Sequence, residues 1–262
     1  MITWQPRLVA LDVDGTLLDS SGTITSTVRH AVARAAESAY VVIATGRTVL
    51  GTLAVLDALS LRTGSAICSN GAVRVDGASG VPTALAAFHP AAALCVLDDA
   101  VPGAHYAVED LGTGHRLSAE FPLGVLSGPA EVVPREELVR GETTRAIAWW
   151  PEHDVHSVGA ALGGVALPSA TGTLDLLGHA WLTMVADGVS KASGLALLAA
   201  ELGVAPEDVL AIGDGTNDTE MLTWAGRGVA MGQASVEVRA AANAVTGAVA
   251  EDGAATELAC WF

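Results

Sequence analysis

Two aspartates separated by a single residue follow a short apolar segment near the start of the chain. Asp12 and Asp14 come directly after residues 8–11, and Gly15 and Thr16 follow at once. An isolated carboxylate is costly to bury, so chains avoid it unless another group pairs with the charge. The pattern therefore predicts that a partner for these carboxylates lies elsewhere in the sequence.

Three later apolar segments also end in polar or glycine residues. These residues are Thr45, Gly46 and Arg47 in the first segment, Asn70 and Gly71 in the second, and Asp214, Asn217 and Asp218 in the third. Because the carboxyl ends of parallel strands lie at one edge of a sheet, we expect these side chains to gather there with Asp12 and Asp14.

The gathered carboxylates predict a magnesium site. Four acids in a small volume raise one another's pKa unless a cation lies between them. Magnesium prefers carboxylate and water oxygens in an octahedral shell. We therefore expect Mg²⁺ as the cofactor.

The same edge holds groups that suit phosphoryl transfer. A carboxylate can attack phosphorus to form an aspartyl-phosphate, which divides a difficult displacement into two easier ones. A second carboxylate two residues on can act as a general acid toward the leaving oxygen and then as a base toward water. Gly15 lets the chain turn with no side chain in the way of a phosphate, and Lys191 offers a positive charge to phosphate oxygens.

Helices are expected between these strands. Val28, Val32 and Ala35 have helical spacing after Thr25 or Ser26, and the segments after Ser190 and from about Ser235 are also predicted to be helical. Short, almost wholly apolar strands that alternate with helices indicate a parallel sheet covered on both faces. The predicted class is α/β, with a doubly wound, Rossmann-like core.

The middle of the chain has a different pattern. Prolines and glycines divide residues 85–185 into shorter pieces, and regular alternation of strand and helix is hard to trace there. We interpret this segment as an inserted α+β cap domain. The catalytic core then consists of residues 1–84 and 186–262.

Composition narrows the choice of partners. The 262 residues include 13 basic and 29 acidic ones, an imbalance that disfavours nucleic acid and anionic membrane surfaces. No apolar run reaches the roughly 18 residues of a membrane span, and the first residues lack the pattern of a signal peptide. Three scattered cysteines form neither a disulfide framework nor a zinc motif. We expect a cytoplasmic protein, monomeric or a small homo-oligomer, that acts on a small phosphorylated metabolite.

The motifs resemble those of a known family. "DVDGTLL", "ATGR", "SNGA", the lysine in "GVSKASGLALL" and "GDGTNDTEM" are similar, in order and spacing, to motifs of the haloacid dehalogenase superfamily. The resemblance is to its Cof-type branch of sugar-phosphate phosphatases, which carry a large cap, and it extends over nearly the whole chain. It implies hydrolysis of a small phosphate monoester, with a sugar phosphate as the favoured substrate class.

The resemblance also implies roles for individual residues. Asp12 would be the nucleophile and Asp14 the acid/base. Asp12, the Asp14 backbone carbonyl and Asp214 would bind magnesium, with Asp218 supporting the metal shell. Thr45 and Lys191 would hold the transferring phosphoryl group. The further substrate- and phosphate-binding candidates are Gly15, Thr16, Gly46, Arg47, Asn70 and Asn217.

Two other functions remain open at this point. In a phosphomutase, a sugar hydroxyl in place of water would resolve the phospho-aspartate. A phosphometabolite-binding regulator would use the same pocket without chemistry, although every expected catalytic group is present. A calcium loop is disfavoured, because an EF-hand needs glycine at position six and glutamate at position twelve, whereas Thr23 is twelfth here.

Some candidates also have purely structural interpretations. Thr45 could cap the helix that follows it, and Arg47 could be a surface residue of that helix. Trp149 and Trp150 could line a pocket for a sugar or ring, but we favour an arrangement in which they straddle a cap sheet, one on each face. His153 and His156 are expected to be exposed or bonded to backbone, since no third metal ligand lies nearby.

Overall fold

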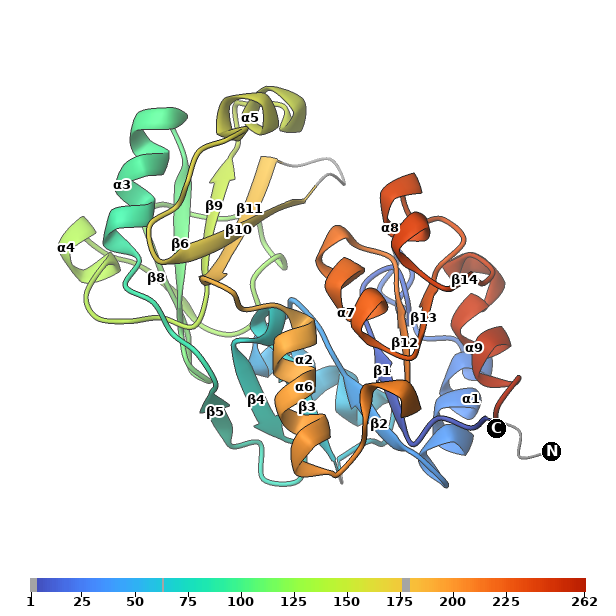
Figure 1. Cartoon of the computed structure of the whole chain (residues 1–262). Helices are drawn as coiled ribbons and strands as arrows, with labels where there is room; N and C mark the ends of the chain where they lie inside the picture. The colour runs from blue at the N-terminus through green and yellow to red at the C-terminus, as the bar shows by residue number, and fades with distance from the viewer. Residues whose placement is uncertain (1–3, 63, 176–179) are drawn as a thin grey trace.

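Five parallel strands form the central sheet in the computed structural model, which describes residues 4–62, 64–175 and 180–262 (Figure 1). Their spatial order is β14 (Ala244–Val245), β13 (Arg227–Ala230), β12 (Val209–Gly213), β1 (Leu8–Leu11) and β2 (Tyr40–Ile43). Leu8 of β1 is in register with Val209 on one side and Tyr40 on the other. The residues that follow β1 therefore lie at the middle of one sheet edge.

Helices cover both faces of this sheet. Val9 and Leu11 pack with α1 (Ser26–Ala36), α2 (Val49–Ala58) and α9 (Gly253–Leu258). Leu8 and Ala10 pack on the opposite face with α6 (Lys191–Glu201), α7 (Thr219–Trp224) and α8 (Val236–Ala241). Because both faces are buried, every residue of β1 must be apolar. The predicted doubly wound α/β class is confirmed.

A small sheet continues beyond β2. Strands β3 (Ser65–Cys68), β4 (Val73–Asp76) and β5 (Pro82–Ala84) pair antiparallel. β3 lies beside β2 with a single parallel bridge, between Ala44 and Ile67. β3 therefore lies where the third parallel strand is expected, but its full ladder of pairs is antiparallel and formed with β4. The 3₁₀ turn η1 (Ser69–Gly71) follows β3 and returns to the edge that carries the strand ends.

The cap is a six-stranded sheet with helices on one face (Figure 1). Its order is β10 (Ala170–Asp175), β11 (Ala180–Ala186), β9 (Ala146–Trp150), β6 (His105–Asp110), β7 (Gly114–Leu117) and β8 (Ala130–Val132). All neighbours pair antiparallel except β7 and β8. The helices α3 (Ala91–Ala100), α4 (Arg135–Leu138) and α5 (Val155–Leu162) bury one face of the sheet. Alternate strand residues on the opposite face turn toward the core.

Side-chain caps fix several helix starts as the sequence predicts. The hydroxyl of Thr25 accepts a hydrogen bond from the backbone of Val28 at α1, and Ser190 and Ser235 cap α6 and α8 in the same way. The N-cap residue of α2 is Thr48, so the interpretation of Thr45 as its cap is wrong.

Short 3₁₀ turns complete the core. They are η2 (Pro206–Asp208), η3 (Thr216–Asp218) and η4 (Val249–Glu251). Of the helices in the described residues, none combines the length and apolar character needed to cross a membrane.

Candidate active site

A buried lysine bridges two aspartates beneath the carboxyl edge of the central sheet. Lys191 Nζ lies 2.6 Å from Asp12 Oδ1 and 2.7 Å from Asp218 Oδ1. The lysine is the first residue of α6, and its side chain is 1% exposed. Burial alone would lower the pKa of Lys191, but the two carboxylates outweigh it and hold the pKa above its ordinary value. The ammonium is therefore fixed as a cation next to Asp12.

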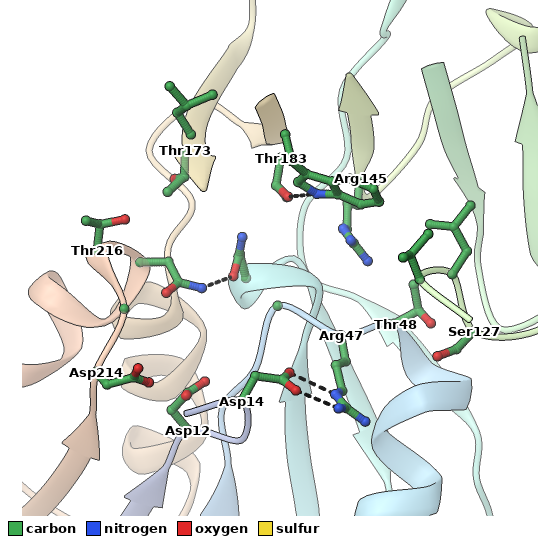
Figure 2. A pocket seen from close by; sticks show the side chains of 18 of the residues that line it. Asp12, Asp14, Arg47, Thr48, Ser127, Arg145, Thr173, Thr183, Asp214 and Thr216 are labelled. Carbon is green, nitrogen blue, oxygen red and sulfur yellow. Dashed lines mark hydrogen bonds and ion pairs between the residues drawn. The ribbon is translucent and has the colours of Figure 1, made fainter. Parts of the chain in front are cut away.

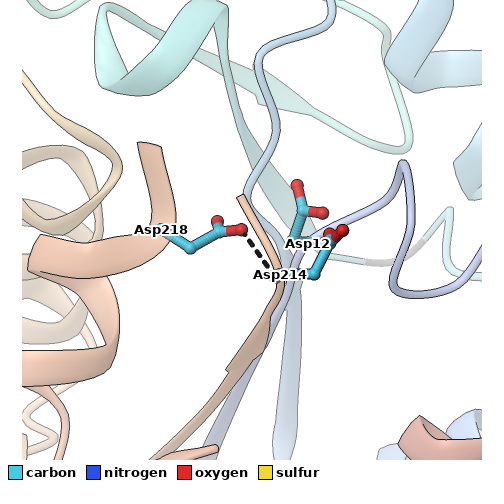
Figure 3. Close-up of side chains that lie close together, drawn as sticks. All are labelled: Asp12, Asp214 and Asp218. Atoms are coloured by element: carbon cyan, nitrogen blue, oxygen red, sulfur yellow. Dashed lines mark hydrogen bonds between the residues drawn. The ribbon is translucent and has the colours of Figure 1, made fainter. Parts of the chain in front are cut away.

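One lysine does not balance the acids around it. Carboxylate oxygens of Asp12, Asp214 and Asp218 all lie within 4.8 Å of one another (Figure 3). Burial, and next the charge of Asp218, raise the pKa of Asp12 to about 8 and that of Asp214 to about 6. Crowded oxygen donors with raised pKa values form a donor set that suits a hard divalent cation such as Mg²⁺.

Asp218 has both of its oxygens occupied by protein donors. Oδ1 accepts from Lys191, while Oδ2 accepts from the backbone N–H groups of Asp214 at 3.0 Å and Gly215 at 2.9 Å. The side chain is fully buried. Asp218 therefore holds the lysine and the loop that carries Asp214 in place.

Asp214 is enclosed by three neighbours. Thr16 Oγ1 donates to its Oδ1 at 3.2 Å, and Gln233 Nε2 lies 3.3 Å from its Oδ2 and 2.6 Å from the carbonyl oxygen of Gly15. Gly15 has a φ of +83°, and a Cβ there would overlap the Asp214 carboxylate. Gln233 is not among the predicted residues; it lies just beyond β13.

Asp14 points away from this cluster and pairs with Arg47. The guanidinium donates from Nε at 2.8 Å and from Nη2 at 2.6 Å to the two Asp14 oxygens (Figure 2). The hydrogen bonds to Asp14 raise the pKa of Arg47. A two-pronged pair of this kind occupies both carboxylate oxygens of Asp14, so Asp14 has to leave Arg47 before it can reach a substrate.

The remaining candidates form the wall between the acids and α2. Asn217 Nδ2 donates to Asn70 Oδ1 at 2.9 Å, and a Cβ on Gly46 would lie 2.9 Å from that same oxygen. Thr45 Oγ1 accepts a 3.1 Å bond from the backbone of Arg47. The structure thus brings every predicted residue to one sheet edge. The side chains of Thr16, Thr45, Lys191 and Asp218 are almost fully buried there.

A cavity of about 600 Å³ lies over this edge, between core and cap (Figure 2). Its core side includes Asp12, Asp14, Arg47, Asn70 and Asp214. Its cap side is made by residues absent from the sequence prediction, namely His115, Leu126, Ser127, Arg145, Trp181 and Thr183. Trp181 and Thr183 occupy alternate positions on β11, and Arg145 directly precedes β9. This period-two spacing marks the sheet face opposite the cap helices.

The predictions for the tryptophan and histidine pairs of the cap domain are confirmed. Trp150 is buried at 1% exposure among the cap helices, while Trp149 lies on the other face beside His105 and Phe121. His153 and His156 are exposed.

Comparison with known proteins identifies similar chains. Residues 9–87 and 171–258 match the family of haloacid dehalogenase-like hydrolases. The chain is 32% identical to the pyridoxal phosphate phosphatase YbhA of Escherichia coli, over 92% of this chain and 93% of that protein. It is 28% identical to the 5-amino-6-(5-phospho-D-ribitylamino)uracil phosphatase YitU of Bacillus subtilis, over 98% of both chains.

A solved structure is also similar to the chain over nearly its whole length. The sugar phosphatase BT4131, of subclass IIB of the superfamily, has a TM-score of 0.79 and 25% identity, over 97% of this chain and 98% of that one. Two further curated relatives match over 81 and 66 residues only, so the match covers 28% and 29% of their own lengths.

Proposed function

The chain belongs to the haloacid dehalogenase-like hydrolase family and is a phosphatase, and we propose that it hydrolyses a small phosphate monoester through an aspartyl-phosphate on Asp12 with the help of Mg²⁺. The observation that carries the proposal is the place of Asp12, a buried carboxylate at the cavity floor with Lys191 on one oxygen. Full-length relatives named for phosphorylated metabolites support a substrate of that class. Among these a sugar phosphate is favoured, as in the structural neighbour.

The first step forms a bond between Asp12 and phosphorus. Lys191 occupies Oδ1, so Oδ2 is the oxygen that attacks. The phosphoryl group enters beside Arg47, whose guanidinium moves from Asp14 to the phosphoryl oxygens and frees Asp14. The ester P–O bond breaks, and a protonated Asp14 gives its proton to the leaving alkoxide.

The second step restores the enzyme. Asp14, now a carboxylate, takes a proton from water while the water oxygen bonds to phosphorus. The bond between Asp12 and phosphorus breaks, and inorganic phosphate leaves. Lys191, Thr45 and Asn217 hold the phosphoryl oxygens during both displacements, so the protein contributes mainly position and positive charge.

Mg²⁺ fits the donor set described above. Asp12, the backbone carbonyl of Asp14 and Asp214 would hold it, with Thr16 and Gln233 orienting Asp214. When bound, the ion supplies positive charge that neutralises the transferring phosphoryl group. Asp218 acts indirectly, because its oxygens already accept hydrogen bonds from three donors.

We also place the enzyme in the cytoplasm. Its three cysteines are all free thiols, one buried and two exposed, and free exposed thiols suit a reducing compartment. The expected partner there is a small phosphorylated metabolite.

The test is a screen of the purified protein against 4-nitrophenyl phosphate and a panel of sugar phosphates, with and without Mg²⁺. We expect turnover that requires the metal and that Asp12→Asn abolishes. Asp99→Asn, which changes an exposed cap carboxylate, is the matched control. Turnover by a folded Asp12→Asn variant at the wild-type rate would show that Asp12 is not the nucleophile.

A further inference from the structure

Three charged or polar side chains form a row across the cap sheet on the face toward the core. Glu109 on β6 is in register with His115 on β7, and the backbone N–H of Glu109 donates to the carbonyl oxygen of Arg145, which directly precedes β9. Exposure is 3% for Glu109, 5% for His115 and 8% for Arg145. The row therefore consists of neighbouring side chains that are all removed from bulk water.

Three buried nitrogens of Arg145 and His115 lack partners within the part of the chain that the structure describes. These are Arg145 Nε and both ring nitrogens of His115. Among the residues that the structure describes, none accepts a hydrogen bond from the guanidinium of Arg145, and none forms a salt bridge with it within 4.0 Å. Buried donors without partners are costly, so natural structures rarely retain them without a function.

Both side chains border the cavity over Asp12. Figure 2 shows the guanidinium of Arg145 directed from the cap down toward the level of Arg47 and Asp14. A ligand whose phosphoryl group lies at Asp12 would therefore extend its leaving group toward Arg145 and His115. The vacant donors face that part of the ligand.

Glu109 accepts no hydrogen bond from the arginine, although the two opposite charges attract each other. Its Oε2 accepts from Ser69 Oγ at 2.7 Å and from Thr144 Oγ1 at 3.2 Å, and its Oε1 has no hydrogen-bond partner among the described residues. The residue does not border the cavity. Burial, and next the charge of Arg145, lower the pKa of His115 to about 4. His115 is thus neutral near pH 7 and adds one N–H donor without a second positive charge.

We propose that Arg145 and His115 form a subsite for an anionic oxygen group on the leaving group, so that the preferred substrates are phosphate monoesters with a second acidic group. This group is a carboxylate or a second phosphate, either of which a guanidinium binds with two parallel hydrogen bonds. The inference rests on the proposed phosphatase function and extends it to the substrate class.

The first test compares matched esters on the wild-type protein. The pairs are 3-phosphoglycerate with glycerol 3-phosphate, 6-phosphogluconate with glucitol 6-phosphate, and fructose 1,6-bisphosphate with fructose 6-phosphate. We expect kcat/KM to be about 10- to 100-fold higher for the acidic member of at least one pair, the range for hydrogen bonds to a charged group. The first two pairs report on a carboxylate and the third on a phosphate. Equal or better turnover of the uncharged member in all three pairs overturns the subsite.

The second test changes the arginine. Arg145→Met should bring the ratio of acidic to uncharged substrate close to one, whereas Arg140→Met, at an exposed cap arginine away from the cavity, should keep the wild-type ratio. If Arg145→Met does not fold, as judged by circular dichroism, Arg145→Lys retains the charge but loses the forked geometry, and the ratio should fall in part. A folded variant with the wild-type ratio contradicts the proposal.

Calorimetry distinguishes failure of the subsite from failure of the proposed phosphatase function. The same pairs are titrated into Asp12→Asn, which binds without turnover, and the acidic members should bind about 10-fold more tightly. Equal binding overturns the subsite even where 4-nitrophenyl phosphate is hydrolysed and the phosphatase function stands. Tighter binding of the acids by a protein that hydrolyses no ester supports the subsite and contradicts the phosphatase mechanism.

Discussion

Ser69 Oγ donates a 2.7 Å hydrogen bond to Oε2 of Glu109, and this bond joins the turn after β3 to the cap sheet. Both residues are buried. Ser69 and Asn70 have φ values of +48° and +52°, a backbone region that non-glycine residues seldom adopt. The turn that places Asn70 at the cavity is therefore strained, and its contact with the cap is one of the interactions that hold it.

Removal of this contact should destabilise the protein. Ser69→Ala leaves the buried carboxylate of Glu109 with one donor fewer, so the free energy of unfolding in urea should fall by about 1–3 kcal/mol. Ser38→Ala, at an exposed serine, is the control and should change stability little. Equal stability of the two variants would mean that Ser69 does not stabilise the cap interface.

The stability of the protein should depend on the ionisation of His115. Its pKa in the folded protein, about 4, lies below the ordinary value, so the folded state binds fewer protons than the unfolded chain between about pH 4 and 6.5. The stability that the folded protein gains from neutral His115 is fully present above about pH 6.5 and is lost as the pH falls toward 4. Between pH 7.5 and 5 the wild type should lose roughly 2 kcal/mol more than His115→Asn. His153→Asn, at an exposed histidine, should follow the wild type, and parallel curves for all three proteins would refute the assignment.

Gly15 should be required for metal binding rather than for folding. In Gly15→Ala the new methyl group overlaps the Asp214 carboxylate, so the carboxylate moves and the magnesium concentration for half-maximal activity should rise at least about 10-fold. Gly22→Ala is a matched control, because its φ of +75° imposes similar backbone strain while nothing lies within 4 Å of the added carbon. A similar magnesium titration for both variants would exclude the steric explanation.

Activity should require a divalent cation held by Asp214. Excess chelator should abolish turnover, and calcium should not restore it, since calcium prefers more ligands in a looser geometry. Asp214→Asn should raise the magnesium requirement steeply, whereas Asp99→Asn should leave it at the wild-type value. Full activity in chelator, or an unchanged titration for Asp214→Asn, would remove Asp214 from the metal site.

Asp14→Asn should separate the two chemical steps. A sugar alkoxide needs a proton to leave, so turnover of sugar phosphates should fall by roughly 100- to 10,000-fold, the usual range for general acid–base catalysis. A nitrophenolate leaves without a proton, so the first step with 4-nitrophenyl phosphate should survive. The second step still lacks its base, and phosphate should accumulate on Asp12.

The accumulation can be observed directly. Asp14→Asn should release up to one equivalent of nitrophenolate in a burst, and the peptide that contains Asp12 should gain the mass of one phosphoryl group. Asp12→Asn should show neither signal. Wild-type rates for Asp14→Asn on both substrates would assign Asp14 to a structural role as the partner of Arg47.

Sequence patterns predict the core of this site because its residues follow buried strands. Asp12, Thr45 and Asp214 are placed by one rule, that parallel strands end at a common edge, and the apolar runs before them make the strands recognisable. The pairing of Asp14 with Arg47 is not predictable in this way. Both residues are expected at the edge, but the rotamers that join them depend on the packed structure.

The cap side of the cavity is harder to predict. Arg145, Trp181 and Thr183 share a sheet face by simple alternation, yet the pattern does not say which face meets the core. That depends on how the inserted domain docks, for instance through the contact of Ser69 with Glu109. The positions that select a substrate are therefore visible only once core and cap are seen together.

The order of strands in the core sheet also has a consequence for folding kinetics. β1 and β12 are neighbours at its centre, although Leu8 and Val209 are about two hundred residues apart in the chain. Closing so long a loop costs entropy before any contact offsets it, which slows folding. β10 and β11 of the cap pair with each other over a short separation, and a folded cap shortens the loop that the core must close. We therefore expect β1 and β12, the strands that precede Asp12 and Asp214, to pair late in folding. The two carboxylates would then come close together, and repel each other, only when the core sheet is complete.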